Sequence, residues 1–275
     1  MRKKSGFWFY LALAGFLLVV LFPFIWQALT SLKSPGELFG EHAFRPVPEH
    51  PTLDNYVKVF TQRPFATYLW NSTWVAVVTT VYCVFVAAIA AYAVARLRFR
   101  GKSLVLGITL AVSMFPQIAT ISPIFIFMEK MGLTNSYTGL IIPYTTFALP
   151  LALWNLTNFF RKIPFELEEA AKMDGATTWQ ALWRVIFPLA MPGTFTTAIL
   201  VFIAAWNEFF FALTINTEES MKTVPVGIAL FQGRFSIPWA EISAASVIVT
   251  IPLVLMVLLF QRRIVDGLTS GAVKE

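Results

Sequence analysis

Six long apolar stretches dominate this sequence, and each is close to the length that a helix needs to cross a lipid bilayer. About 20 mainly apolar residues span the hydrocarbon core, where the backbone finds no water and must satisfy its own hydrogen bonds. The stretches cover residues 7–32, 73–95, 104–128, 138–160, 194–216 and 242–260. We therefore expect an all-α integral membrane protein with six transmembrane helices in one transmembrane domain covering residues 1–275.

Composition excludes several other classes of protein. Hydrophobic residues make up 57% of the chain and charged residues 13%, whereas soluble domains average about 45–50% and 25%. The 27 Phe and nine Trp are too many for a disordered chain. One cysteine allows no intrachain disulfide, and the two histidines have no partners at metal-ligand spacing, so no metal site is expected. The net charge of +6 is divided among short segments between apolar blocks, which argues against nucleic-acid binding.

The distribution of positive charge predicts the orientation in the membrane. Fourteen of the 21 Lys and Arg fall on the side that carries both termini, so the positive-inside rule places both termini in the cytoplasm. The first stretch is longer than a secretory signal and lacks a small-residue cleavage site, which favours a retained anchor. On the outer side, residues 33–70 contain five prolines and predict turns, with a short amphipathic helix at 54–60.

The cytoplasmic segment 161–192 is too polar to span and longer than a helix connection needs. Pro164 suits the start of a short helix, and Gly175 suits a left-handed stop. Thr177 and Gln180 have the spacing of a capping box for a second helix, which Pro188 and the proline at 192 are expected to end. One face of this helix is apolar: Trp179, Leu182, Trp183 and Ile186. Periodicity alone fits equally a helix-Gly-helix element that docks another protein and an amphipathic hairpin on the lipid headgroups.

A resemblance to a known family favours the docking element. Glu169-Ala170-Ala171-x-x-Asp174-Gly175-Ala176, followed by Ile186-Phe187-Pro188-Leu189-x-x-Pro192, resembles the EAA loop of permease subunits in bacterial ABC importers. Further segments resemble the carbohydrate importers, above all the second permease of maltose- and trehalose-type systems: Met114-Phe115-Pro116-Gln117, Ala205-Trp206-Asn207-Glu208-Phe209, Val224-Pro225-Val226-Gly227 and the terminal run from Gly267 to Lys274. The resemblance covers most of the chain.

The resemblance implies a set of partners in a bacterial cell membrane. A second, homologous permease would complete a heterodimer, two ATPase subunits would bind ATP and Mg²⁺ below it, and an extracytoplasmic binding protein would deliver a sugar such as maltose or trehalose. This chain would hold no cofactor of its own. Its tail, 261–275, would reach toward the ATPases. The residues that would couple to the ATPases are Glu169, Ala170, Ala171, Asp174, Gly175 and Ala176.

Two sequence features test whether the chain has catalytic machinery of its own. Gly101-Lys102-Ser103 resembles the end of a phosphate-binding loop, but Arg96 stands where the first glycine belongs and a membrane helix precedes it in place of a strand. The sequence also contains neither a serine nucleophile elbow nor an H-E-x-x-H pair. We therefore expect a transport subunit that is not an enzyme, with no catalytic residue.

Polar residues at membrane depth are the candidates for the translocation pathway: Asn155, Asn158, Trp206, Asn207 and Glu208. An acidic side chain near the membrane centre costs about 2.5–3.5 kcal/mol on insertion scales, so Glu208 should face protein or water. For Glu208 we expect a structural or gating role in preference to sugar contact. Prolines in the predicted spans can bend them: Pro116, Pro123, Pro143, Pro150 and Pro252. The alanines at 87, 91 and 95 give one small-residue face for close helix packing.

Two alternatives remain open on the sequence. The same scaffold motifs serve permeases for other solutes, such as glycerol phosphate. A proton-coupled secondary transporter that uses Glu208 would carry out uptake without ATP.

Overall fold

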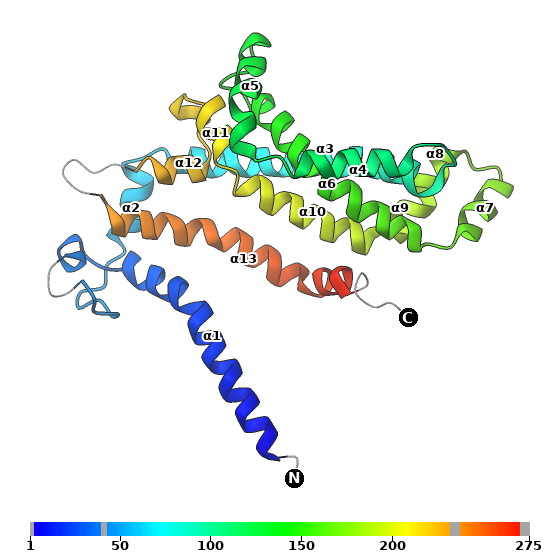
Figure 1. Ribbon diagram of the computed structural model, residues 1–275. Coiled ribbons are helices and arrows are strands. Elements are labelled where there is room, and N and C mark those ends of the chain that lie inside the picture. The colour runs from blue at the N-terminus through cyan, green and yellow to red at the C-terminus, as the bar shows by residue number, and fades with distance from the viewer. Residues whose placement is uncertain (1–2, 40–42, 232–236, 270–275) are drawn as a thin grey trace. The chain divides into compact units, whose positions relative to one another are not determined.

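The computed structural model describes residues 3–39, 43–231 and 237–269, and every regular element in those ranges is a helix (Figure 1). Four helices are each long and apolar enough to cross a membrane: Gly6–Ser31, Phe65–Arg96, Tyr137–Lys162 and Trp239–Gln261. Two further pairs of helices would each make one span with a sharp bend inside it. The all-α membrane fold is thus confirmed, with four crossings, or six if each bent pair is one span. The count of six stays a prediction.

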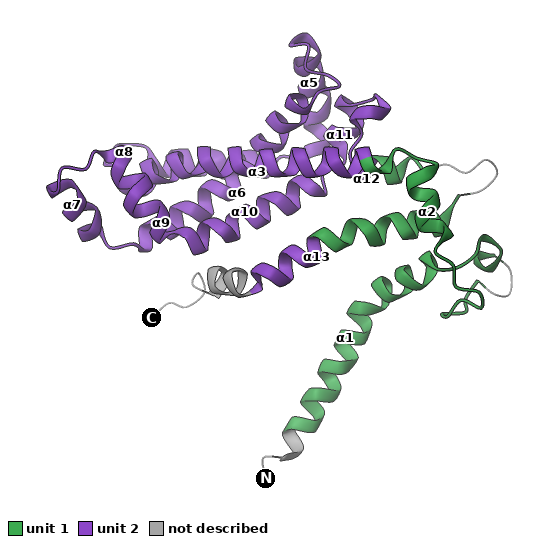
Figure 2. Ribbon diagram, turned by 180° about the vertical axis from the view of Figure 1, so that it is seen from behind, with its two compact units in different colours: residues 1–66, 227–252 green, residues 67–226, 253–275 purple. Residues whose placement is uncertain are grey.

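The contacts between helices divide the chain into two compact units (Figure 2). Unit 1 contains residues 1–66 and 227–252, and unit 2 contains residues 67–226 and 253–275. The division at residue 252 falls inside the long last helix, α13 (Trp239–Thr269). That this chain forms a single transmembrane domain remains a prediction.

Unit 1 begins with α1 (Lys3–Ser31), which is followed by η1 (Pro35–Leu38) and α2 (Asp54–Thr61). The helix expected at 54–60 is therefore present as α2. The Asn55 side chain donates to the carbonyl oxygens of Ser31 and Lys33 at 2.8 and 2.9 Å, which ties α2 to the end of α1. The apolar window of α1 has no buried residue, so unit 1 by itself leaves this apolar surface uncovered.

Unit 2 is a bundle around α3 (Phe65–Arg96), α6 (Tyr137–Lys162) and α10 (Met191–Trp206). It also contains α4 (Lys102–Ser113), α5 (Gln117–Lys130), α7 (Phe165–Met173), α8 (Thr178–Ala181), η3 (Leu182–Ile186), α9 (Phe187–Leu189), α11 (Phe210–Ile215), η4 (Glu219–Met221), α12 (Val224–Ala229), which continues into unit 1, and the part of α13 after residue 252. Ala87, Ala91 and Ala95 are buried in one core cluster with Leu182 and Ile186. The predicted small-residue face is confirmed, and among its partners is the segment after α8.

Bends occur where the backbone cannot continue its hydrogen bonds. The α4 and α5 axes meet at 96° around Pro116, as expected for a residue without an N–H. The other four candidate prolines, at 123, 143, 150 and 252, lie inside continuous helices.

The prediction that Pro188 and Pro192 end the second helix agrees with the described structure, in which this helix runs from Thr178 to Leu189 and stops between the two prolines. Helical backbone continues through Pro188, and Pro192 lies in the first turn of α10. A first-turn proline is tolerated because its missing N–H has no partner there in any helix. The chain turns by 82° between Leu189 and Met191.

One glycine permits the close approach of α6 and α10. A Cβ atom built on Gly193 would lie 2.2–2.4 Å from ring atoms of Phe159, closer than real Cβ contacts allow. The rigid ring therefore sits directly on the α10 backbone, which joins these two helices.

The predicted tail, 261–275, lies only partly within the described chain. The α13 helix continues to Thr269, and residues 270–275 lie outside the described residues.

Candidate functional site

The segment between α6 and α10 forms the helix-Gly-helix element that the sequence predicts. The α7 helix ends at Met173, and Gly175 has a φ angle of +86°, in the left-handed region that favours glycine. Thr177 and Gln180 form a complete capping box at the start of α8, since each side chain bonds the other residue's backbone N–H. Both local predictions are confirmed by this geometry.

A π-helical turn follows α8. In η3 the backbone N–H of Phe187 bonds the carbonyl of Leu182, five residues back. Pro188 has no N–H to offer the carbonyl four residues before it, so the wider turn lies where the regular pattern is already interrupted.

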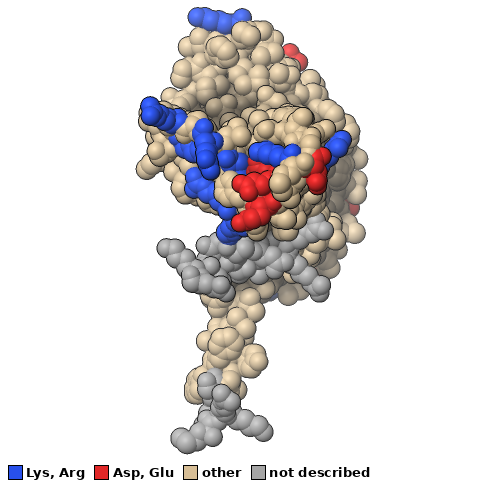
Figure 3. All heavy atoms as spheres, turned by 90° about the vertical axis from the view of Figure 1, so that its right-hand side faces the viewer, with Lys and Arg blue, Asp and Glu red and all other residues tan. Residues whose placement is uncertain are grey.

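Most residues expected to couple to ATPases lie on an exposed face of this element. Glu169, Ala170, Asp174 and Gly175 are exposed, whereas Ala171 and Ala176 are half-buried. The same element exposes large apolar side chains: Phe165, Leu167, Met173 and Trp179. Figure 3 looks onto this end of unit 2 and shows acidic side chains beside basic ones. Exposed apolar groups flanked by charge are typical of a protein-binding surface.

Glu168 differs from its neighbour Glu169 because its side chain points inward. Only 4% of the residue is exposed. One carboxylate oxygen, Oε1, accepts hydrogen bonds of 2.7 Å from the Tyr92 hydroxyl and from Lys172 Nζ. Burial alone would raise the pKa of Glu168, but the hydrogen bonds of Lys172 and Tyr92 and the charges of Lys172 and Arg96 lower this pKa below its ordinary value. Glu168 is therefore a buried, ionised carboxylate.

Arg96, at the end of α3, lies beside Glu168 and joins three elements. Its Nε is 3.9 Å from Glu168 Oε2, and its Nη2 donates to the carbonyls of Phe160 and Ile163 at 2.5 Å each. These carbonyls lie at the C-terminal end of α6, where a cation is favoured by the helix dipole. The guanidinium also lies 4.3 Å from the ring centroid of Phe165, at the start of α7.

Sequence reasoning did not single out Tyr92, Arg96 or Glu168 as a site. The available signal was helical spacing. Tyr92 and Arg96 are four residues apart on α3, and Glu168 and Lys172 are four residues apart on α7, so each pair shares one helix face. That the two faces meet is a property of the tertiary structure.

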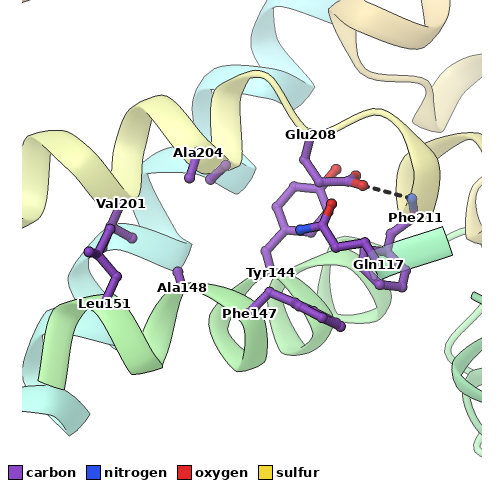
Figure 4. A pocket seen from close by; sticks show the side chains of 10 residues that line it. Gln117, Tyr144, Phe147, Ala148, Leu151, Val201, Ala204, Glu208 and Phe211 are labelled. Atoms are coloured by element: carbon purple, nitrogen blue, oxygen red, sulfur yellow. Dashed lines mark hydrogen bonds between the residues drawn. The ribbon is translucent and has the colours of Figure 1, made fainter. Parts of the chain in front are cut away.

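A small cavity lies in unit 2 among α5, α6, α10 and α11 (Figure 4). Its volume is about 90 Å³, and its polar lining residues are Gln117, Tyr144 and Glu208. The rest of the lining is apolar: Phe147, Ala148, Leu151, Val201, Ala204, Ala205 and Phe211. Ligand pockets usually have volumes of about 300–1,000 Å³, so this cavity by itself is too small for a disaccharide.

Glu208 caps the short helix α11. The fifth predicted span is interrupted at Asn207–Phe209, and α11 begins after this break. The Glu208 carboxylate accepts from the backbone N–H groups of Phe211 and Ala212 at 2.8 and 3.2 Å, and Figure 4 draws the bond from Phe211. Tyr144 points toward the same carboxylate. The acidic side chain thus faces protein, and its contacts are those of a structural group at the wall of the cavity.

The other pathway candidates do not line this cavity. Trp206 is buried and stacks on Phe202, with ring centroids 5.6 Å apart. Asn207 is exposed and donates to the Ile203 carbonyl at 2.8 Å, while Asn155 and Asn158 are half-buried. Gln117 and Tyr144, which do line it, were not predicted as site residues. Gln117 belongs to a quoted family motif, whereas nothing local distinguished Tyr144.

The chain is similar over most of its length to permease proteins of known transport systems. Residues 83–270 match the family described as binding-protein-dependent transport system inner membrane component. The trehalose transport system permease protein SugB of Mycobacterium tuberculosis is 48% identical, with 92% of each chain covered. The trehalose/maltose permease protein MalG of Thermococcus litoralis is 47% identical, covering 94% of this chain and 92% of the relative.

A third relative and a solved structure are named for other substrates. The sulfoquinovosyl glycerol permease protein SmoH of Agrobacterium fabrum is 43% identical, over 92% of this chain and 89% of the relative. A chain from the crystal structure of a bacterial ABC transporter for the acidic polysaccharide alginate superposes with a TM-score of 0.81. It is 25% identical, and the match covers 95% of this chain and 98% of that one.

The family match covers more than half of the chain, and the relatives match it nearly end to end. This chain belongs to the family of binding-protein-dependent transport system inner membrane components, and it is a membrane-embedded permease of the ABC importer type, a transport component rather than an enzyme.

Proposed function

We propose that this chain forms half of the translocation pathway of a bacterial sugar importer and couples that pathway to separate ATPase subunits through the element 161–192. The observation that carries the coupling assignment is the opposite exposure of Glu168 and Glu169. The inward carboxylate holds the element to α3, and the outward one lies on a free surface with Asp174. An element that is fixed to the membrane helices on one face and exposed on the other can pass a movement of the ATPase subunits to those helices.

A second permease subunit is supported by two features of this chain. The α1 helix buries none of its apolar window, so another chain can pack against it. The cavity beside Glu208 has about 90 Å³, well below a sugar-sized pocket of about 300 Å³ or more. We infer that the pathway is completed between this chain and a homologous partner, whose relative position changes during transport.

The substrate class is supported by the relatives. Two of the most similar relatives carry trehalose or maltose in their names. A disaccharide or oligosaccharide is therefore favoured as the substrate.

The orientation with both termini in the cytoplasm is supported by the same element. Residues 161–192 must lie on the ATPase side, where Arg161, Lys162 and Lys172 accompany them, as the positive-inside rule requires. ATP and Mg²⁺ would be held by the ATPases, and a sugar-binding protein would act on the outer side.

The test is uptake by a reconstituted complex. The chain is co-purified with its partner permease and ATPases, placed in proteoliposomes, and supplied with labelled trehalose or maltose on the cognate binding protein. Uptake should require ATP on the side of the vesicle membrane that carries the ATPases. It should persist when an ionophore removes the proton gradient. Uptake that follows the proton gradient and ignores ATP would establish the secondary-transporter alternative.

A further inference from the structure

The buried contact between Arg96 and Glu168 has unused hydrogen-bonding capacity. Within the described residues, Arg96 Nε and Nη1 and Glu168 Oε2 are buried without a hydrogen-bond partner. The side chains are 0% and 5% exposed, and Nε lies 3.9 Å from Oε2. Buried charged groups normally satisfy every donor and acceptor, because each unmet one carries a desolvation penalty. The pair therefore has a closer arrangement available that would be more favourable.

A small movement reaches that arrangement. Charged N–H···O⁻ hydrogen bonds have lengths of about 2.7–2.9 Å, so a shift of about 1 Å of α7 toward α3 closes the gap between Nε and Oε2. The contact on Oε1 acts as the pivot, since Tyr92 is bonded to it at 2.7 Å. Before the gap closes, Arg96 is held by its bonds to Phe160 and Ile163.

The opposite end of α3 is fastened to the loop between α11 and α12. Asn71 Nδ2 donates to the carbonyls of Ser220 and Lys222 at 2.9 Å each. The backbone N–H of Val224 donates to Ser72 Oγ at 2.8 Å. At 1.5 Å per residue, about 38 Å of continuous helix separates Asn71 from Arg96. One helix thus connects the coupling element to the loop on the other side of the membrane.

We propose that Arg96 and Glu168 form a two-state latch, open in this structure, that closes when the ATPases move α7 and passes the displacement through α3 to the loop at 217–223. Both are positioning residues, because neither lies on the exposed docking face or in the cavity. The inference rests on the proposed function. It adds that the second predicted span transmits the motion, although α7 is joined in sequence to α6.

The experiment uses the complete reconstituted complex and three conservative variants. Glu168→Gln removes the negative charge and keeps the shape of the side chain. Arg96→Lys keeps the positive charge and removes the guanidinium, with the Nε that faces Glu168. Tyr92→Phe removes the hydrogen bond to Glu168 Oε1. Glu241→Gln is the matched control, because it neutralises another paired glutamate, whose partner is Arg63 at 3.8 Å in unit 1. Sugar uptake and ATP hydrolysis are measured in the same vesicles.

We expect Glu168→Gln and Arg96→Lys to lower the sugar transported per ATP by about tenfold, within the usual range of allosteric coupling, while the ATPases still co-purify. Combining the two should add little, because both break one contact. The control should retain the wild-type ratio. If the pair were purely structural, breaking it would instead reduce assembly of the complex and leave the sugar transported per ATP unchanged.

A second measurement reports the far end of α3. Cys83 is the only cysteine and is fully buried, so Ser220→Cys, an exposed position, allows selective labelling of this subunit with an environment-sensitive fluorophore. With cysteine-free partner subunits, nucleotide trapping should change the emission in the wild-type background and leave it unchanged with Glu168→Gln.

Three results would overturn the latch. They are a normal transport ratio in both charge variants, an unaltered fluorescence response in Glu168→Gln, and failure of all three variants to assemble, which would make the contact a support of the fold. Failure of the proposed function looks different, since wild-type uptake would then be independent of ATP.

Discussion

Replacement of Gly175 isolates the contribution of one backbone angle to coupling. The residue has a φ of +86°, and a Cβ added there would meet nothing within 4 Å. Gly175→Val therefore introduces no clash, and its effect comes only from the left-handed conformation. That conformation costs about 1–2 kcal/mol for a residue with a Cβ, and a β-branched residue lies at the upper end.

This free-energy difference predicts a measurable loss of uptake. A penalty of 1–2 kcal/mol reduces the ratio of native to non-native turn by a factor of about 5–30. We expect ATP-dependent uptake to fall by up to this factor, with weaker retention of the ATPases and normal membrane insertion. Gly175→Asn should be milder, because Asn enters the left-handed region more readily.

Gly107→Ala is the control for a glycine substitution as such. Gly107 lies within α4, has no positive φ and has open space at its Cβ position, so Ala should be tolerated there. Gly175→Val with wild-type uptake and wild-type ATPase retention would refute the assignment of this turn to coupling.

Three further outcomes follow from particular contacts. Gly193→Ala places a Cβ against the Phe159 ring and should destabilise the bundle by about 1–3 kcal/mol, measured as a lower thermal unfolding temperature; an unchanged temperature would contradict the close packing of α6 and α10. Glu208→Ala removes the cap of α11, a change worth about 0.5–2 kcal/mol, and should reduce uptake more than ATPase retention; normal uptake kinetics would remove Glu208 from the functional residues. The pKa of Glu168 is lowered in the folded protein, so its charge stabilises the wild type above the ordinary glutamate pKa and this stabilisation is lost as pH falls through the lower, folded value; thermal unfolding should therefore show an acid-dependent loss that Glu168→Gln lacks, and equal profiles would disprove the role of the charge.

Local features of the helix-Gly-helix element were predictable because their causes are local. Gly175 was expected to be left-handed since few other residues adopt that angle without strain, and Thr177 and Gln180 bond within one turn of helix. The π-helical turn just before Pro188 was not predictable in the same way. It lies where Leu182 and Ile186 pack in the core cluster with α3.

For the candidate pathway, too, the sequence identified polar residues at membrane depth, but only the tertiary structure showed which of them lie together. Glu208 attracted attention because a carboxylate at membrane depth is expensive, and the structure places it at the cavity with Tyr144 and Gln117. Asn155 and Asn158 carried the same polar signal, yet they lie away from that cavity. Which polar side chains share a space depends on how α6 turns relative to α10, and hydropathy does not encode that rotation.

The sequence by itself determined the all-α membrane class and the helix-Gly-helix element, because hydropathy, caps and left-handed turns act over a few residues of contiguous chain. Only the tertiary structure decided that Glu168 faces inward while Glu169 faces outward, and that Arg96 meets Glu168. That contact joins two helices distant in sequence, and its energy depends on burial and on separations of a few ångströms that exist only after the helices have packed.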